Sequence, residues 1–277
     1  MKKKNRKTKK RFIIFIALLM AFTSIWYWNN FTIRTTEQTI LSDKINGEVQ
    51  IVLISDLHGA SFGKDNSRLI KKISDANPNL IFVLGDMYSC GHTEDIEKTV
   101  KLIENLTEIT DTFLITGDHD TDDSYKQELK KLKNLHYLSF ESQDITVNGT
   151  DITVYGVDNV YFSPTYDLNN AFTQPDSNRL NILLAHIPQY PYYDSFNVDL
   201  IFCGDSHGGM IRLPFLGGIY YEGYLFPKIT YPGEVTDKGL YQYSQKSMFV
   251  TSGLGWNPLP IRLNNRPEIC KITLKGV

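Results

Sequence analysis

The sequence predicts an α/β domain with a largely parallel sheet, preceded by one membrane-spanning helix. Apolar runs of strand length occur five times, and segments with apolar residues at helical spacing separate the first three of them. A basic run followed by an uncharged apolar stretch begins the chain. Alternation of strands with helices is typical of parallel sheets whose faces are covered by helices.

The composition is that of a folded globular chain. Of the 277 residues, 42% are hydrophobic and 22% are charged, which excludes wholesale disorder, collagen and coiled coil. The three cysteines, Cys90, Cys203 and Cys270, are too few and too far apart for a disulfide framework or a Cys-x-x-Cys zinc site. Any metal would therefore need carboxylates and histidines as ligands.

The N-terminal segment divides into a basic tail, residues 1–11, and an apolar stretch, residues 12–28. Eight Lys or Arg residues fall within residues 2–11, and the next seventeen residues carry no charge. A helix of that length spans about 25 Å, slightly less than a hydrocarbon core of roughly 30 Å, so the flanking basic and aromatic residues have to extend it. Basic residues before the span predict a cytoplasmic tail and a domain on the extracytoplasmic side of the cell membrane.

A cleaved signal peptide is the alternative to a membrane anchor. The pattern of small residues expected before a cleavage site is poor around residues 21–24, so we expect an uncleaved, single-pass signal anchor. Residues 29–46 are polar with scattered apolar residues, which is typical of a short tether or a first strand. Residues 47–277 then form the folded domain.

The charge of the chain outside its basic tail argues against a nucleic-acid-binding surface. Residues 12–277 hold 21 of the 29 Lys and Arg residues against all 31 acidic residues, a net charge of −10. An acidic surface does not attract polyanions. We expect no nucleic-acid partner.

The five apolar runs each end in acidic residues or histidines. They cover residues 49–58, 79–86, 112–120, 181–186 and 198–207. Continuous apolar runs are typical of strands buried on both faces. Ligands of parallel sheets bind at the carboxyl ends of the strands, which is where these polar groups fall.

Two helices are predicted between the first three strands. Residues 64–77 place Leu69, Ile70 and Ile73 on one face, and the Asn77-Pro78-Asn79 sequence ends this helix. Residues 94–109 repeat apolar side chains at helical spacing. Both helices are expected to cover the sheet.

The strand-end residues together predict a metal site. Any one of them could be an ordinary turn residue, but eight oxygen and nitrogen donors at one sheet edge would repel one another and would be costly to desolvate without a cation. The number of donors is sufficient for two ions. The donors are Asp56, His58, Asp86, Asp118, His119, His186, Asp205 and His207.

The order of these motifs resembles that of the calcineurin-like metallophosphoesterases. The motifs are Ser55-Asp56-Leu57-His58, Gly85-Asp86, Gly117-Asp118-His119-Asp120, Ala185-His186 and Gly204-Asp205-Ser206-His207. Residues 252–255 (SGLG) and 262–268 (RLNNRPE) also resemble the membrane-associated bacterial branch of that superfamily. The resemblance implies a four-layered α-β-β-α sandwich, with residues 144–157 and 248–274 as strands of the second sheet.

The resemblance also implies a role for each motif residue. Asp56, His58 and His207 would hold one divalent ion, Asp86 would bridge two, and the second ion would be held by Asp118, His186 and Asp205. A metal-bound hydroxide would attack phosphorus in a phosphomonoester, phosphodiester or pyrophosphate, and His119 would stabilise or protonate the leaving oxygen. The substrate would be a small or membrane-held phosphate ester.

Two residues depart from the family pattern. The family usually has Asn at the position of Asp118 and His at the position of Asp205. An oxygen-rich shell favours manganese or iron over zinc, so we expect those ions at the second site. A degenerate second site in a non-catalytic, membrane-anchored binding or scaffold protein is the alternative.

Other residues near the motifs have weaker predictions. Asp120 either orients the ring of His119 or caps a helix over residues 121–133, and the helix cap is the better supported of the two. Arg212 and Arg262 are candidate phosphate contacts, because a guanidinium matches phosphate geometry. The aromatic stretch from residue 215 to 232 is expected to form a loop beside the site.

Overall fold

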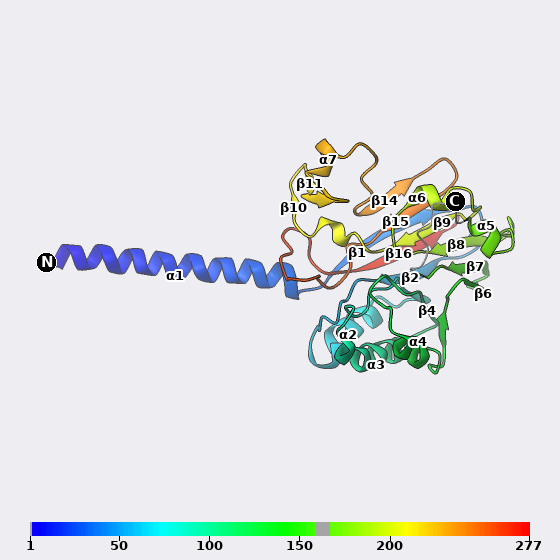
Figure 1. Ribbon diagram of the computed structural model, residues 1–277, viewed down its shortest axis with the longest axis horizontal. Helices are drawn as coiled ribbons and strands as arrows, with labels where there is room; N and C mark the ends of the chain where they lie inside the picture. The colour runs from blue at the N-terminus through cyan, green and yellow to red at the C-terminus, as the bar shows by residue number, and fades with distance from the viewer. Residues whose placement is uncertain (1, 159–166) are drawn as a thin grey trace.

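Two six-stranded sheets face each other, and a long N-terminal helix projects from one end of the domain that contains them (Figure 1). The computed structural model describes residues 2–158 and 167–277. The two sheets and the helices on their outer faces form four layers, in agreement with the four-layered α-β-β-α sandwich that the sequence predicts.

The first sheet has the strand order β1-β16-β2-β3-β4-β5. The strands from β2 to β5 are parallel, β16 is antiparallel to β2, and β1 is parallel to β16. Their bounds are β1 (Arg34–Leu41), β16 (Glu268–Lys275), β2 (Val49–Ile54), β3 (Leu80–Val83), β4 (Thr112–Leu114) and β5 (Leu135–Tyr137).

The second sheet has the strand order β14-β15-β9-β8-β7-β6. The four central strands are parallel, and an antiparallel strand closes each edge. Their bounds are β14 (Gly239–Gln242), β15 (Ser247–Val250), β9 (Leu200–Cys203), β8 (Leu180–Leu184), β7 (Thr150–Gly156) and β6 (Glu141–Val147).

The five apolar runs are divided between the two sheets. The first three form β2, β3 and β4 of the first sheet, and the last two form β8 and β9 of the second. The apolar pattern predicted that all five strand ends lie at the edge of a single sheet. This prediction is wrong, because a strand buried on both faces has the same apolar pattern in either sheet. The second-sheet strands expected over residues 144–157 are confirmed as β6 and β7, whereas residues 248–274 are split between β15 in the second sheet and β16 in the first.

Helices cover the outer face of each sheet. On the first sheet these are α2 (Ser67–Asp75), α3 (Ile96–Thr107) and α4 (Asp123–Leu129), and on the second they are the short α5 (Leu168–Ala171) and α6 (Tyr190–Tyr193). Figure 1 shows α2, α3 and α4 along one side of the domain. Leu69 and Ile73 of α2 are buried, as their helical spacing predicts.

The core between the sheets is made by alternate residues of the central strands. Ile51 and Leu53 of β2 lie in the same buried cluster as Phe202 of β9, whereas Val52 and Ile54 face the helices. Burial of each such side chain contributes about 1.5–3 kcal/mol to folding. The apolar packing therefore holds the carboxyl ends of strands from both sheets at fixed positions.

The N-terminal helix α1 (Lys2–Phe31) is continuous. Within it, residues 9–31 are long and apolar enough to cross a membrane, with a mean hydropathy of 1.7 over the most apolar window. The segment after it, expected as a tether over residues 29–46, is mainly β1, which pairs along its whole length with β16. Of the two alternatives for this segment, the first strand is the one observed.

The aromatic stretch after the last motif forms small hairpins. These are β10 (Arg212–Leu213) with β11 (Gly217–Gly218) and β12 (Tyr220–Tyr221) with β13 (Tyr224–Leu225), followed by α7 (Pro227–Thr230). Three short 3-10 turns also occur, at Lys64–Asn66, Thr93–Asp95 and His207–Gly209.

Candidate metal centre

The predicted site residues come together at the carboxyl ends of five parallel strands, three from one sheet and two from the other. The loops after β2, β3 and β4 carry the ligands on one side, and the loops after β8 and β9 carry those on the other. Because the two sheets face each other, their loops meet across a single centre. The residues are Asp56, His58, Asp86, Asp118, His119, His186, Asp205 and His207.

Asp86 lies in the middle of this cluster. Its Oδ2 is 3.5 Å from Nε2 of His58 and 3.3 Å from Nε2 of His186. It also belongs to two separate groups of potential ligands, one with His58 and one with His186. One carboxylate is therefore shared by two neighbouring sets of donors.

The donors around Asp86 fall on two sides. On one side, Nε2 of His58 lies 3.1 Å from Nε2 of His207, and Asp56 completes the group. Two imidazole nitrogens that each bind one ion at about 2.1 Å, with an angle of about 90° at the ion, lie about 3 Å apart. On the other side, Nε2 of His186 is 3.5 Å from Oδ1 of Asp118 and 3.9 Å from Oδ1 of Asp205.

The backbone at the ligand positions is strained. Five of the predicted ligands have a positive φ, in the range 47° to 64°, although none of them is glycine. Each such residue costs about 1–3 kcal/mol and persists only where the surrounding structure imposes it. The strain bends the loops so that their side chains point inward. The five residues are Asp56, His58, Asp86, Asp205 and His207.

Two glycines leave room for the carboxylates. A Cβ at Gly117 would lie 2.1 Å from Oδ1 of Asp86, and one at Gly253 would lie 2.5 Å from Oδ2 of Asp56. Gly253 also has a φ of 66°. A larger side chain at either position would displace a ligand.

Two buried side-chain atoms that could bind a metal indicate that the cluster fits a divalent cation. Among the residues that the structure describes, Oδ2 of Asp56 and Nε2 of His186 have no hydrogen-bond partner. Nδ1 of His186 lies 2.6 Å from the carbonyl oxygen of Leu84, so Nδ1 carries a proton, and Nε2, directed at the carboxylates, is the atom that would bind a cation once it gives up its own proton. Unpartnered buried acceptors are costly, and a cation would satisfy both.

The electrostatics of the cluster also favour a cation. Burial, together with Asp86 and Asp205, raises the pKa of Asp56 to about 7, and burial raises the pKa of Asp205 to about 6. Burial lowers the pKa of His58 to about 4. Burial alone would lower the pKa of His186, but the carboxylates beside it raise it. The cluster therefore holds protons that a divalent ion would displace.

His119 lies at the edge of the cluster with a defined tautomer. The backbone N–H of Cys90 donates to its Nδ1 at 3.1 Å, so the neutral ring carries its proton on Nε2. The side-chain amide of Asn257 is 3.1 Å from that Nε2, and its oxygen can accept the proton once the amide is turned by 180°. The ring is half-buried and stands edge-on to His58, with centroids 4.9 Å apart.

Asp120 has neither of its two predicted roles. Its carboxylate is buried and accepts hydrogen bonds from the backbone N–H groups of Met87 and Gly117, both at 3.0 Å. The N-cap position of α4 is occupied by Asp122 instead. Asp120 therefore ties the loop after β3 to the loop after β4, and both loops carry ligands.

Both predicted phosphate contacts have partners within the protein; Arg262 is buried, which corrects the prediction for it, whereas Arg212 is half-buried. Arg262 is buried, and its guanidinium donates to the carbonyl oxygens of Gly255, Ser252 and Asn265 and lies 3.3 Å from Nδ1 of His207. Arg212 forms an ion pair with Asp237 at 2.6 Å. The guanidinium of Arg262 thus connects the backbone around residues 252–265 to His207, a candidate metal ligand, and is not free to contact a substrate.

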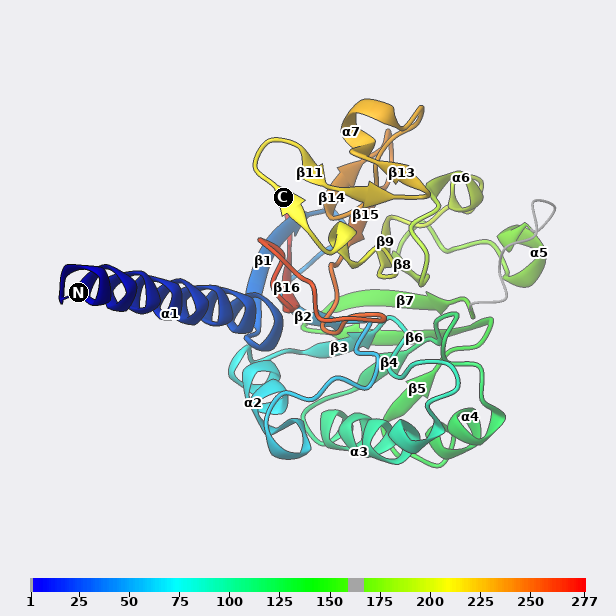
Figure 2. The same cartoon turned by 60° about the vertical axis from the view of Figure 1, so that its left-hand side comes forward.

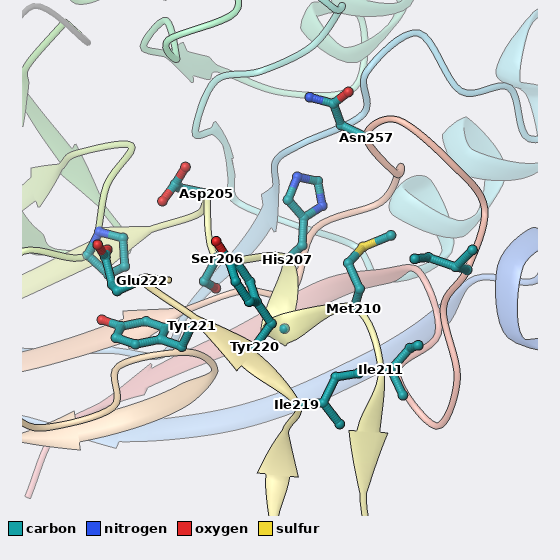
Figure 3. A pocket seen from close by; sticks show the side chains of 13 residues that line it. Asp205, Ser206, His207, Met210, Ile211, Ile219, Tyr220, Tyr221, Glu222 and Asn257 are labelled. Carbon is teal, nitrogen blue, oxygen red and sulfur yellow. The ribbon is translucent and has the colours of Figure 1, made fainter. Parts of the chain in front are cut away.

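A cavity of about 490 Å³ adjoins the cluster. Figure 3 shows Asp205, His207 and Asn257 in the upper part of the view, Ile211 and Ile219 in the lower part, and Met210 between them. The stretch from residue 215 to 232 contributes Ile219 to Glu222 to its wall, which places this stretch beside the site as predicted.

The sequence reasoning missed the residues that hold the ligands in place. Ser89 lies 3.2 Å from Nδ1 of His58, and Asn257 contacts a histidine 138 residues away in the chain. Ser89 follows Asp86 by three residues in the same loop, a proximity that could have indicated it. No spacing could have indicated Asn257.

Comparisons with known proteins agree with this geometry. The sequence profile of the calcineurin-like phosphoesterase family matches residues 49–209. The chain is 28% identical over 257 residues to the uncharacterized metallophosphoesterase YkuE of Bacillus subtilis, covering 88% of this chain and 86% of that protein. It is 27% identical over 248 residues to the phosphodiesterase YaeI of Escherichia coli, covering 81% and 82% of the two chains.

Solved structures of similar fold include the NAD nucleotidase of Haemophilus influenzae. That structure matches with a TM-score of 0.47 and 16% identity, and the match covers 74% of this chain and 44% of that one. The family profile covers more than half of the chain and contains each strand that carries a predicted ligand. The chain therefore belongs to the calcineurin-like phosphoesterase family.

Proposed function

We propose that this chain is a membrane-anchored phosphoesterase with a dinuclear metal centre. It cleaves phosphomonoester, phosphodiester or pyrophosphate bonds in a small or membrane-held substrate. The observation that carries the proposal is the position of Asp86 between His58 and His186, where one carboxylate serves two sets of donors. The name of the Escherichia coli relative, a phosphodiesterase, supports the reaction class.

The ligand residues divide between two ions. Asp56, His58 and His207 would hold the first, Asp118, His186 and Asp205 would hold the second, and Asp86, which lies between the two groups, would be shared by both. Divalent ions bound there would polarise the phosphoryl oxygens and make a nucleophilic water available near neutral pH. The chain itself contributes orientation, because the strained loops and the buried core fix every donor.

His119 is the residue that stabilises or protonates the leaving oxygen. The N–H of Cys90 fixes its tautomer, so Nε2 carries the proton, and the leaving oxygen would take the place of the Asn257 side chain that faces it. A positioned proton donor of this kind contributes about 10²–10⁴-fold to a rate.

The second site should prefer manganese or iron. Carboxylate oxygens of Asp86, Asp118 and Asp205 lie 3.3, 3.5 and 3.9 Å from Nε2 of His186, and that of Asp56 lies 4.0 Å away. Oxygen-rich shells favour these ions over zinc. Both departures from the family pattern supply a ligand atom that lies near the others, which supports an adapted centre over a degenerate one.

The anchor proposal depends on α1. Its span of residues 9–31 is long and apolar enough to cross a membrane. Its N-terminal flank is basic, which favours a cytoplasmic tail and an extracytoplasmic catalytic domain in the cell membrane.

The test is hydrolysis of an aryl phosphodiester and an aryl phosphomonoester by the full chain in detergent. The protein would be stripped of metal and then supplied with Mn, Fe(II), Mg or Zn singly. We expect metal-dependent turnover, highest with Mn or Fe(II), that His58→Ala and Asp86→Ala abolish.

The matched controls replace the same residue types away from the centre. His92→Ala and Asp75→Ala change an exposed histidine and an exposed aspartate, and both should retain turnover. If the folded wild-type chain hydrolyses neither ester with any of the ions, the non-catalytic binding protein becomes the better account.

A further inference from the structure

The loop of residues 256–264, here called the rim loop, is fastened to the end of α1. Nε1 of Trp26 donates to the carbonyl oxygen of Pro260 at 2.8 Å. The side chain of Asn30 donates to the carbonyl oxygen of Arg262 at 3.1 Å and accepts from its N–H at 2.8 Å. The ring of Phe31 stands edge-on to that of Trp256, with centroids 5.1 Å apart. These contacts tie the rim loop to the helix end.

These contacts set the depth of the rim loop relative to the apolar span. Trp26 lies at the end of the uncharged run in α1, and tryptophan at the end of a membrane span lies at the membrane–water interface. Pro260 is hydrogen-bonded to Trp26, so it lies at the same depth. Its neighbours Leu259 and Ile261 are 59% and 51% exposed, which makes them apolar side chains at the level of the interface.

A further exposed apolar side chain lies at this end of the domain. The turn between β10 and β11 carries Phe215, which is 98% exposed. Figures 1 and 2 both show this hairpin and the rim loop at the end of the domain from which α1 leaves. An apolar side chain at a hairpin tip is suited to shallow insertion among lipid headgroups.

Basic side chains surround the helix end. Arg68 and Lys72 of α2 line a hollow with Phe31 and Thr32, and the guanidinium of Arg266 lies 4.1 Å above the ring of Trp28. Residues 12–277 are acidic as a whole, so cations at this place are not a general property of the surface. Basic residues beside a span attract anionic headgroups by about 1 kcal/mol each.

We infer that the rim loop and the β10–β11 turn insert into the same membrane interface as the end of α1. This inference rests on the proposed membrane span. The partner is the lipid surface, because the bond to Trp26 determines the depth of the loop and the basic residues complement anionic headgroups. The rim loop also supplies Asn257 and Ile261 to the wall of the cavity that reaches His207, so the metal centre opens at the bilayer surface.

The experiment measures the depth of single positions in the full chain, reconstituted into vesicles of phosphatidylcholine and phosphatidylglycerol with brominated acyl chains. The background is Cys90→Ser, because the other two cysteines are buried. An environment-sensitive fluorophore is attached through Leu259→Cys, Leu41→Cys or Leu18→Cys, one at a time. All three leucines are exposed, at 59%, 61% and 64%.

Leu41 is the matched control for Leu259. It ends β1, seven residues beyond Arg34, which places it about 23 Å further from α1 at roughly 3.3 Å per residue. We expect brominated lipid to quench the fluorophore at positions 18 and 259 and to leave the one at position 41 unquenched.

The remaining outcomes separate this inference from the proposed anchor. Quenching at position 18 with an unquenched position 259 would keep the span and overturn the insertion of the rim loop. A fluorophore at 259 that is shielded from water only at high protein density, without quenching by lipid, would assign the surface to a second copy of the chain and overturn the lipid partner. An unquenched position 18 would overturn the anchor and this inference together.

Discussion

The tautomer of His119 determines what that residue can contribute to catalysis. Its Nδ1 accepts from the backbone of Cys90, which leaves a proton on Nε2 beside the candidate metal ligands. A proton at that position matters most when the leaving oxygen is a poor leaving group, because a good one departs without protonation.

The variant His119→Gln tests this role. We expect kcat to fall by about 10²–10⁴-fold for an alkyl phosphate ester and by much less for a nitrophenyl ester. Metal content, measured by elemental analysis, should be retained. An equal loss for both esters, or a loss of metal, would assign His119 to the metal shell in place of proton transfer.

The carboxylates of Asp118 and Asp205 are expected to set metal preference. The double variant Asp118→Asn, Asp205→His removes two formal negative charges from the group around His186. Activity with zinc should rise relative to activity with manganese, because imidazole suits zinc better than carboxylate does. Metal titrations of both proteins measure the ratio. An increase in turnover with every ion would indicate that the natural site is impaired.

At the residue scale, sequence reasoning found the side chains that cluster at the candidate metal centre and missed the residues that support them. A ligand that follows an apolar strand is visible in the sequence, because strand and ligand are neighbours in the chain. The role of Arg262 depends on contacts with Ser252, Gly255 and His207, and that of Asn257 on a contact with His119, so packing alone decides them. Arg262 was therefore predicted as a substrate contact when it is a buried structural residue.

At the element scale, one buried carboxylate joins β1 and β16 to the loop after β15. Glu268 accepts hydrogen bonds from Arg34 and Thr36 of β1, from Lys238, and from the N–H of Ser252. Burial alone would raise its pKa, but Lys238 and Arg34 lower it to about 2. The attachment of the first strand to the domain therefore depends on this charge.

The variant Glu268→Gln should lower the free energy of unfolding by about 3 kcal/mol at pH 7, because it leaves the buried Lys238 without its counter-charge. The folded pKa lies below the unfolded value of 4.5, so the contribution is present above pH 4.5 and is lost as pH falls toward 2. Urea unfolding at pH 7 and at pH 3 should show the difference between variant and wild type shrinking at the lower pH.

The control for this prediction is Glu48→Gln. Glu48 pairs with Lys275 at 2.9 Å, but both side chains are about half exposed, and the substitution should change stability little. If the two variants behave alike, the buried network does not hold β1.

The elements themselves were predictable to different degrees. The helices around residues 64–77 and 94–109 and the central strands were predicted because apolar periodicity is local. The assignment of strands to sheets could not be predicted in this way, because β15 and β16 are consecutive in the chain but belong to different sheets. The edge strand β1 is mostly polar and partly exposed, so its pattern was compatible with a tether.

At the scale of the whole molecule, the metal centre is expected to contribute to stability. It joins loops of both sheets, and without a cation it retains two carboxyl groups whose pKa values are raised, to about 7 for the buried Asp56 and about 6 for the half-buried Asp205. A carboxyl group with a raised folded pKa costs stability once it ionises. The metal-free protein should therefore lose stability from these groups as pH rises from about 4 to about 7.

Calorimetry with and without chelator tests this dependence. At an ion concentration of 100 Kd, binding contributes about 2.7 kcal/mol, which corresponds to a rise in Tm of about 5–10 °C for a domain of this size. The rise should be larger at pH 8 than at pH 5, where protons compete for the carboxylates. Asp86→Ala should show no rise. An equal rise at both pH values would mean that the ions bind elsewhere.

The position of β16 has a consequence for how the molecule is made. Residues 268–275 are synthesised after every other strand described here, yet they lie between β1 and β2 in the first sheet. Until they emerge, β1 has no neighbour to pair with and the apolar edge of β2 stays open. The segment that joins α1 to the domain can thus pair with the first sheet only after residues 268–275 have been synthesised, so this pairing forms later than the contacts among β2, β3 and β4 can form.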